Sequence, residues 1–184
     1  MQTKIPKTLN SSCAHHGKVF DLIIEDIEYP SGRRGIREIA RHNGGSVIVP
    51  LFDNGDILLV RQYRQPFHKD VLELPAGKLE PNEDPLLCAQ RELQEETGLT
   101  AEKFEKLTAM YSTPGFCSEI LHIYLATGIT QSPKGQALEE GELSLTLERY
   151  PLAAAVAMVE REEIVDGKSI AGILMTNNKL NHRQ

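Results

Sequence analysis

The stretch of residues 77–99 reads GKLEPNEDPLLCAQRELQEETGL and decides the fold. Within it, Asp84 followed by Pro85 is typical of a helix N-cap with proline at the first helical position, where a missing N–H costs no hydrogen bond. Gly98 is typical of the left-handed residue that ends a helix. The stretch therefore predicts a helix over residues 85–97, bounded by a turn at each end.

Three carboxylates lie on one face of this predicted helix. Glu92, Glu95 and Glu96 are spaced i, i+3 and i+4, so their side chains fall within an arc of about 100°. Such like charges repel one another unless a cation lies between them. Oxygen ligands on one rigid face suit Mg²⁺, for which Mn²⁺ can substitute. A solvated acidic face is the commoner cause of such a triplet, so the triplet alone leaves both interpretations open.

The whole stretch resembles the Nudix box, the signature of a family of hydrolases that cleave pyrophosphate bonds. The box is a glycine, five residues, Glu, seven residues, Arg-Glu, an apolar residue, any residue, Glu-Glu, any residue, Gly and an apolar residue. Every specified position is matched, by Gly77, Glu83, Arg91, Glu92, Leu93, Glu95, Glu96, Gly98 and Leu99. The resemblance implies the Nudix fold, an α/β/α sandwich around a mixed sheet, and magnesium-dependent hydrolysis.

The resemblance also assigns roles within the box. Glu92 and Glu96, one helical turn apart, match the metal ligands, and Glu95 matches a further ligand or a partner of a ligand. The carbonyl group of the residue before the box glycine often binds metal in this family, and that residue is Ala76. Glu83 and Arg91 are expected to form an ion pair that holds the loop against the helix.

The composition limits the remaining possibilities. The chain has 184 residues, 40% apolar and 25% charged, which is close to an average single globular domain. Its net charge of −6 argues against nonspecific binding to nucleic acid. No apolar run approaches the ~20 residues that span a bilayer, so no membrane association is expected. Cys13, Cys88 and Cys117 contain no CxxC pair, so neither a disulfide framework nor a zinc site is expected, and a cytoplasmic location is predicted.

Strands dominate the predicted layout, which is α+β. Strands are expected at residues 18–28, 36–42, 46–52, 56–63, 71–74, 104–111, 120–126 and 143–150, and helices at 85–97, 151–161 and 169–180. Residues 1–17 are expected to be a flexible leader. Residues 18–184 are expected to form a single Nudix domain, with an extra N-terminal antiparallel hairpin at 18–42 and a catalytic core at 43–184.

Substrate preference is indicated outside the box. Residues 112–119 read STPGFCSE, and Pro114 lies 16 residues after Gly98 (114 − 98). This motif and this spacing resemble those of the ADP-ribose pyrophosphatases of the Nudix family. Without the box, this Pro-Gly step would be an ordinary turn. The resemblance implies that Glu119 contacts the bound nucleotide. Arg64, at the end of a predicted strand, matches a residue that grips the pyrophosphate, because guanidinium offers two parallel donors to phosphate.

Other residues complete the expected substrate site. Arg37 is a second candidate of the same type as Arg64. In ADP-ribose pyrophosphatases a glutamate on a late loop acts as the base toward the attacking water, and Glu142 in the acidic loop 138–143 matches it best, with Glu140 next. A solvated acidic loop is the alternative interpretation of that segment.

The resulting prediction is magnesium-dependent hydrolysis of ADP-ribose to AMP and ribose 5-phosphate. Two alternatives stay open. One is another nucleoside diphosphate sugar, such as GDP-mannose, and the other is a ligand-sensing Nudix domain that binds without hydrolysis. The resemblance further implies a homodimer that exchanges residues 18–42 between its subunits.

Overall fold

The computed structural model describes residues 5–182, which form two compact units. One unit comprises the residues up to Gly44 together with Tyr111–Ile120, and the other comprises Gly45–Met110 and the chain from Leu121 onward. Among the described residues, none of the helices combines the length and the apolar character needed to cross a bilayer.

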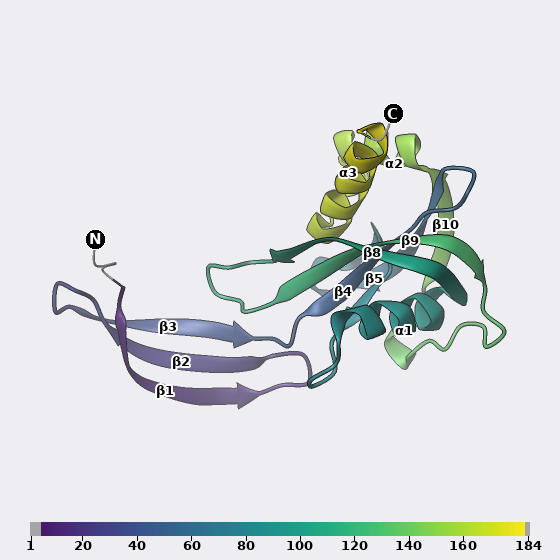
Figure 1. Cartoon of the computed structure of the whole chain (residues 1–184). Coiled ribbons are helices and arrows are strands. Elements are labelled where there is room, and N and C mark those ends of the chain that lie inside the picture. The colour runs from purple at the N-terminus through teal and green to yellow at the C-terminus, as the bar shows by residue number, and fades with distance from the viewer. Residues whose placement is uncertain (1–4, 183–184) are drawn as a thin grey trace. The chain divides into compact units, whose positions relative to one another are not determined.

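The first unit is built on an antiparallel sheet of three strands, in the order β1-β2-β3 (Figure 1). The strands are β1 (Lys7–His16), β2 (Asp21–Glu28) and β3 (Arg34–Arg41). Ile23 and Ile27 of β2 are its buried apolar residues. The predicted hairpin is present as β2 and β3.

The flexible leader predicted for residues 1–17 is wrong for Lys7–His16, which is strand β1. All ten of its residues are exposed, so it lacks the alternation of apolar and polar residues by which a strand is recognised. Its order comes from backbone pairing with β2, from Lys7 opposite Glu28 to His16 opposite Asp21. Residues 1–4 of the predicted leader lie outside the described residues.

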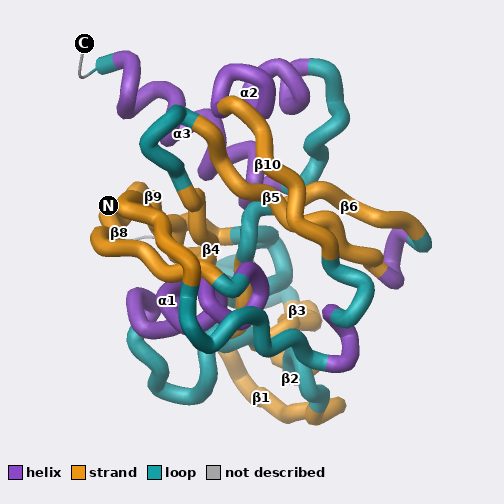
Figure 2. Tube along the Cα trace, turned by 90° about the vertical axis from the view of Figure 1, so that its right-hand side faces the viewer, coloured by secondary structure: helices purple, strands orange, loops and turns teal. Residues whose placement is uncertain are grey.

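The second unit contains two sheets (Figure 2). In the four-stranded sheet, of order β7-β4-β9-β8, β4 pairs parallel with β9 and antiparallel with β7, which makes the sheet mixed. Its strands are β4 (Gly45–Pro50), β7 (Ala76–Lys78), β8 (Leu99–Tyr111) and β9 (Ile120–Gln131). The three-stranded sheet is antiparallel and consists of β10 (Thr146–Pro151), β5 (Asp56–Arg64) and β6 (Lys69–Glu73).

Helices cover both faces of the four-stranded sheet. Helix α1 (Pro85–Thr97) lies on one side, while α2 (Leu152–Glu160) and α3 (Gly167–Asn181) lie on the other (Figure 1). Strand β4 is buried throughout because its side chains alternate between the two layers. Val47 and Val49 pack in the core that includes residues of α2 and α3, and Ile48 packs with residues of α1. This arrangement confirms the α+β class and the α/β/α sandwich.

Two short 3₁₀ helices lie in the loops of this unit, counted over its residues up to 182. The helix η1 (Gln65–Phe67) follows β5, and η2 (Glu140–Glu142) lies in the acidic loop before β10.

Candidate active site

Helix α1 begins and ends where the sequence predicts. The Asp84 carboxylate accepts a hydrogen bond from the backbone N–H of Leu86 at 2.8 Å, and Gly98 at φ 69° donates its backbone N–H to the carbonyl of Gln94. These caps fix which face of the helix the acidic residues occupy. Glu92 and Glu96 are only 8% and 2% exposed, so the interpretation as a solvated acidic face fails for both.

The strand before the helix is in close contact with these carboxylates. A Cβ atom on Gly77 would lie 1.8 Å from the carboxyl carbon of Glu92, so a side chain at that position and the native Glu92 conformation exclude each other. One residue earlier, the backbone N–H of Ala76 donates to Glu96 Oε2 at 3.0 Å. The structure thus brings together Ala76, Glu92 and Glu96, the three main metal candidates.

Arg91 joins the loop of the box to its helix. Its Nε and Nη2 donate to the two carboxylate oxygens of Glu83, each at 3.0 Å, which confirms the predicted ion pair. Its Nη1 donates to Glu92 at 2.6 Å and to Glu95 at 2.9 Å. Glu95 is therefore engaged at the rim of the cluster, where it is partly exposed.

Burial dominates the electrostatics of the two inner carboxylates. It raises the pKa of Glu92 to about 7, although Arg91 opposes the shift, and it raises the pKa of Glu96 to about 8. The charge of Glu92 adds to the shift of Glu96, and the charge of Glu142 raises the pKa of both. Buried carboxylates that raise each other's pKa fit a hard divalent cation.

The two candidate bases differ in their surroundings. Glu142 is partly buried, its carboxylate accepts from the backbone N–H of Glu139 at 3.0 Å, and its charge acts on Glu92 and Glu96. Glu140, by contrast, is exposed. The structure therefore distinguishes two residues that the sequence leaves nearly equivalent.

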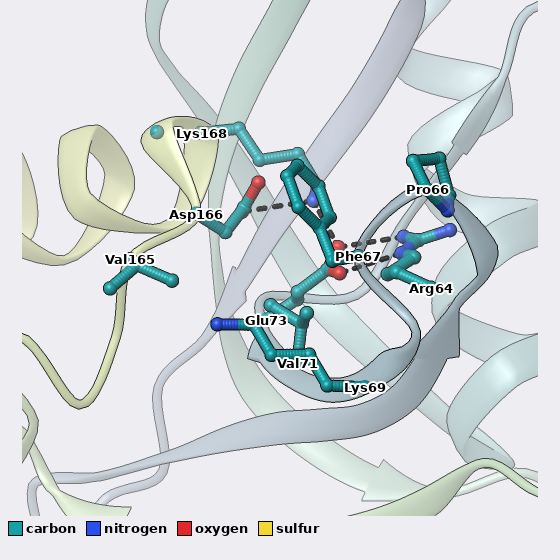
Figure 3. A pocket seen from close by; sticks show the side chains of 10 residues that line it. Arg64, Pro66, Phe67, Lys69, Val71, Glu73, Val165, Asp166 and Lys168 are labelled. Carbon is teal, nitrogen blue, oxygen red and sulfur yellow. Dashed lines mark hydrogen bonds and ion pairs between the residues drawn. The ribbon is translucent and has the colours of Figure 1, made fainter.

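Arg64 is held by a carboxylate that the sequence analysis missed. Its Nε and Nη2 donate to Glu73 at 2.6 and 2.7 Å, and Lys168 forms a further ion pair with Glu73 (Figure 3). Lys168 also lies 2.9 Å from Asp166, the N-cap residue of α3. Glu73 is 3% exposed, and a charged residue in the otherwise apolar strand Val71–Leu74 was the signal that could have revealed it.

This charged cluster borders a pocket of about 620 Å³. Arg64, Glu73 and Lys168 line it together with apolar side chains that include Phe67 and Val165 (Figure 3). The charges of Arg64 and Lys168 each interact with that of Glu96. Two of the cations that line the pocket are therefore close enough to the acidic cluster to act on Glu96.

The other three candidates belong to the first unit. Pro114 lies in a turn closed by the N–H of Cys117 donating to Thr113, and Glu119 Oε1 lies 3.5 Å from His42 Nδ1. Arg37 donates to the hydroxyl of Tyr29 at 2.7 Å. Their expected contacts with a substrate remain predictions.

The loop that carries Pro114 and Glu119 is joined to β3 by backbone hydrogen bonds. The N–H of Ala40 donates to the carbonyl of Phe116, and the N–H of Ser118 donates to the carbonyl of Ala40. This attachment explains why residues 111–120 belong to the same unit as the N-terminal sheet.

Comparison with known proteins agrees with this geometry. The family model described as NUDIX domain matches residues 42–171. The chain belongs to the Nudix family. It is 40% identical to an ADP-ribose pyrophosphatase of Bacillus subtilis (strain 168), over 94% of this chain and 93% of the relative. It is 36% identical to a methanol dehydrogenase activator of Bacillus methanolicus, over 96% of each chain.

Two further matches are more distant. A GDP-mannose pyrophosphatase of Yersinia enterocolitica is 31% identical over 84% of this chain and 83% of the relative. The crystal structure of an ADP compounds hydrolase superposes with a TM-score of 0.84, covering 97% of this chain and 95% of that chain at 24% identity. This likeness confirms the fold.

Proposed function

We propose that this Nudix protein hydrolyses the pyrophosphate bond of ADP-ribose with the help of Mg²⁺, giving AMP and ribose 5-phosphate. The observation that carries the proposal is the buried cluster of Glu92 and Glu96 against Ala76, in an intact Nudix box. The similarity to an ADP-ribose pyrophosphatase over most of both chains supports the choice of substrate.

The acidic cluster has the donor chemistry for Mg²⁺, with Mn²⁺ as a substitute. Glu92, Glu96 and the Ala76 carbonyl would hold the metal, and Glu95 would support it from the rim through Arg91. When bound, the metal neutralises phosphate charge and lowers the pKa of a coordinated water.

Glu142 is the residue we assign as general base. Its carboxylate is close enough to the acidic cluster to affect the pKa of Glu92 and Glu96. It would accept the proton of the water that attacks phosphorus, a role that requires a carboxylate within hydrogen-bonding reach of that water. The hydrogen bond from the Glu139 N–H holds the Glu142 side chain in place.

Arg64 is assigned to the substrate phosphates. The Nε and Nη2 of Arg64 donate to Glu73. This leaves Nη1 as the guanidinium nitrogen without a partner among residues 5–182. Glu73 and Lys168 would keep the guanidinium plane fixed, so that less conformational freedom is lost when the substrate binds. Arg37, Pro114 and Glu119 are assigned to the nucleotide on the basis of the motif alone.

Two alternatives share this machinery in whole or in part. Hydrolysis of GDP-mannose would use the same metal and base, and a relative with that name is 31% identical. A sensing role would keep binding but not turnover, and the relative named as an enzyme activator makes this worth testing. One assay distinguishes both alternatives from the proposed hydrolysis of ADP-ribose.

The test is product analysis of the purified chain with ADP-ribose and Mg²⁺ in ¹⁸O-labelled water. We expect AMP and ribose 5-phosphate, with the label in one of them. A panel that includes GDP-mannose measures kcat/KM for each substrate, and a preference for GDP-mannose would contradict the proposed specificity. Binding of ADP-ribose without release of AMP would favour the sensing role.

The matched variant is Glu96→Gln, which keeps the shape and the hydrogen bond from Ala76 but removes the charge. We expect the fold to persist and turnover to be abolished. A variant with the wild-type rate would remove Glu96 from the metal site.

We further propose a homodimer formed through the N-terminal segment, residues 18–42. Three large apolar side chains of that segment are exposed in the single chain: Val19 at 56%, Phe20 at 44% and Ile36 at 62%. A partner subunit that covered these side chains would remove their apolar surface from water. The cytoplasmic location stays a prediction from the cysteine content.

A further inference from the structure

A second group of metal-binding side chains lies in the first unit, at the turn between β1 and β2. Cys13 and His16 are at the end of β1, and Asp21 is the first residue of β2. His16 and Asp21 are paired in the strand register. One ligand atom from each of the three side chains lies within 4.8 Å of the other two.

A strand irregularity brings Cys13 to the same side as His16. In a regular strand, residues three apart point to opposite faces. Here the register shifts between Cys13 and His15, and an irregularity of this kind inserts an extra residue and re-aims the side chains beyond it. The Cys13 thiol also donates to the carbonyl of His15 at 3.2 Å, across the same irregularity. The sequence spacing alone therefore could not show this cluster.

Two of the three distances between the ligand atoms match a tetrahedral metal site. Cys13 Sγ lies 3.4 Å from His16 Nδ1, and His16 Nδ1 lies 3.3 Å from Asp21 Oδ1. Zinc bonds of about 2.0–2.1 Å to nitrogen or oxygen and about 2.3 Å to sulfur place neighbouring ligands about 3.3–3.6 Å apart. Both observed distances fall in that range.

A neutral imidazole nitrogen can hydrogen-bond with only one of these two partners at a time, because it either donates or accepts. The 3.3 Å separation of His16 Nδ1 and Asp21 Oδ1 exceeds the usual N–H···O range of about 2.7–3.2 Å. In addition, Cys13 and Asp21 approach the same ring nitrogen. A nucleophilic Cys-His-Asp triad needs the thiol and the carboxylate on opposite nitrogens, one for each partner. Convergence on one nitrogen fits a shared metal ion instead.

We propose that Cys13, His16 and Asp21 bind one transition-metal ion, for which Zn²⁺ is the best match. Sulfur and imidazole nitrogen favour Zn²⁺ over Mg²⁺, which prefers oxygen ligands such as those of the Nudix box. Binding replaces the thiol proton of Cys13, which is released to solvent. Three protein ligands leave a fourth position open to water or another exogenous ligand. The site would tie the end of β1 to the start of β2.

This site differs from the expectation that the three cysteines take no part in zinc binding. That expectation rested on the absence of a CxxC pair in the sequence. The structure supplies the remaining ligands from a histidine and from an aspartate across a turn, so a second cysteine is not needed.

The test is a titration of the reduced full-length chain with Co²⁺, a spectroscopic probe for zinc sites, followed by displacement with Zn²⁺. Sulfur ligation gives a thiolate-to-cobalt charge-transfer band, which the oxygen ligands of the Nudix box cannot produce. We expect one equivalent of Co²⁺ to produce this band and Zn²⁺ to remove it.

Variants assign the ligands. Cys13→Ser should abolish the band, and His16→Asn and Asp21→Asn should each weaken binding at least as much as the ~10–100-fold that loss of an outer partner costs. Cys117→Ser and His15→Asn are matched controls that remove a thiol and an imidazole outside the cluster, and both should retain the band. Circular dichroism confirms that each variant is folded.

Three results would overturn the proposal. The wild-type chain could show no thiolate band in Co²⁺. The band could disappear in Cys117→Ser rather than in Cys13→Ser. Finally, the band and the affinity could survive both His16→Asn and Asp21→Asn, which would leave a single thiol and no shared site.

Discussion

At the scale of single residues, Gly77 is the glycine with the least room for a side chain among the described residues. The carboxyl group of Glu92 occupies the place of a Cβ atom, at 1.8 Å from its ideal position. In Gly77→Ala, Glu92 must move or the strand must shift. We expect a loss of turnover with Mg²⁺ of at least about 100-fold, since small displacements in a site can cost that much, and a loss of stability of about 1–3 kcal/mol.

Steady-state kinetics and urea unfolding measure these two effects. Gly167→Ala is the matched control, because a Cβ at Gly167 meets nothing within 4 Å and the residue lies at the start of α3. It should keep its stability. If Gly77→Ala retained full activity, Glu92 could not be a metal ligand in its observed position.

Glu142 and Glu140 are a second test at the same scale, because they are two residues apart in one 3₁₀ helix. For Glu142→Gln we expect kcat to fall by about 10²–10⁴, the usual contribution of a general base, with a smaller change in KM. For Glu140→Gln we expect nearly wild-type kinetics, since that side chain is exposed. The reverse pattern would move the base to Glu140.

The sequence predicts these sites unevenly for a physical reason. The box residues of α1 are set by local rules, namely helix periodicity and the caps at Asp84 and Gly98, so their common face could be predicted. Contacts between distant segments follow no local rule. The pair of Arg64 with Glu73 and the approach of Lys168 from α3 depend on how β5, β6 and α3 meet, and the sequence analysis missed both partners.

At the scale of elements, the start of α3 is joined to the sheets by polar contacts. Ser169 accepts a hydrogen bond from the N–H of Leu74 at 2.7 Å, and Lys168 is paired with Glu73 at the end of β6. The first contact is buried and the second is partly buried. Loss of a hydrogen bond to a charged group costs about 1.5–3 kcal/mol. For Lys168→Met we expect the free energy of unfolding at neutral pH to fall by about 2 kcal/mol.

The pH dependence of that loss is specific. Burial raises the pKa of Glu73, but the hydrogen bond from Arg64 and the charge of Lys168 outweigh it, and the net pKa lies below the usual value. A depressed pKa in the folded state stabilises the protein above the unfolded pKa of about 4.3, and the stabilisation is lost as the pH falls through the folded pKa. The difference between wild type and Lys168→Met should therefore be largest at neutral pH and shrink in acid.

Urea unfolding at neutral pH and at successive pH values below about 4.3 measures this difference. Lys168→Arg, which keeps the charge, should retain most of the stability. A difference that stays constant down to the lowest pH at which the protein folds would show that Lys168 contributes through packing rather than through the charge of Glu73.

At the scale of the whole molecule, the candidate residues divide between two compact units. The acidic cluster, Glu142 and Arg64 belong to one unit, whereas Arg37, Pro114 and Glu119 belong to the other. The sequence placed a boundary near residue 42 but assigned the loop at 111–120 to the catalytic core. Its backbone bonds to β3 place it with the N-terminal sheet, because Ala40 pairs with Cys117, 77 residues further along the chain (117 − 40). A local sequence pattern cannot predict such a pairing.

The proposed dimer is the prediction that belongs to this scale. Phe20 and Ile36 are large apolar side chains on the segment expected to be exchanged, and their exposure in a single chain costs free energy that a partner would recover. We expect light scattering after gel filtration to give twice the chain mass, and Phe20→Ser combined with Ile36→Ser to shift the equilibrium to monomer. Leu87→Ser, at an equally exposed position on α1, is the control and should remain dimeric. A wild-type chain that is monomeric at micromolar concentration would contradict exchange of the N-terminal segment.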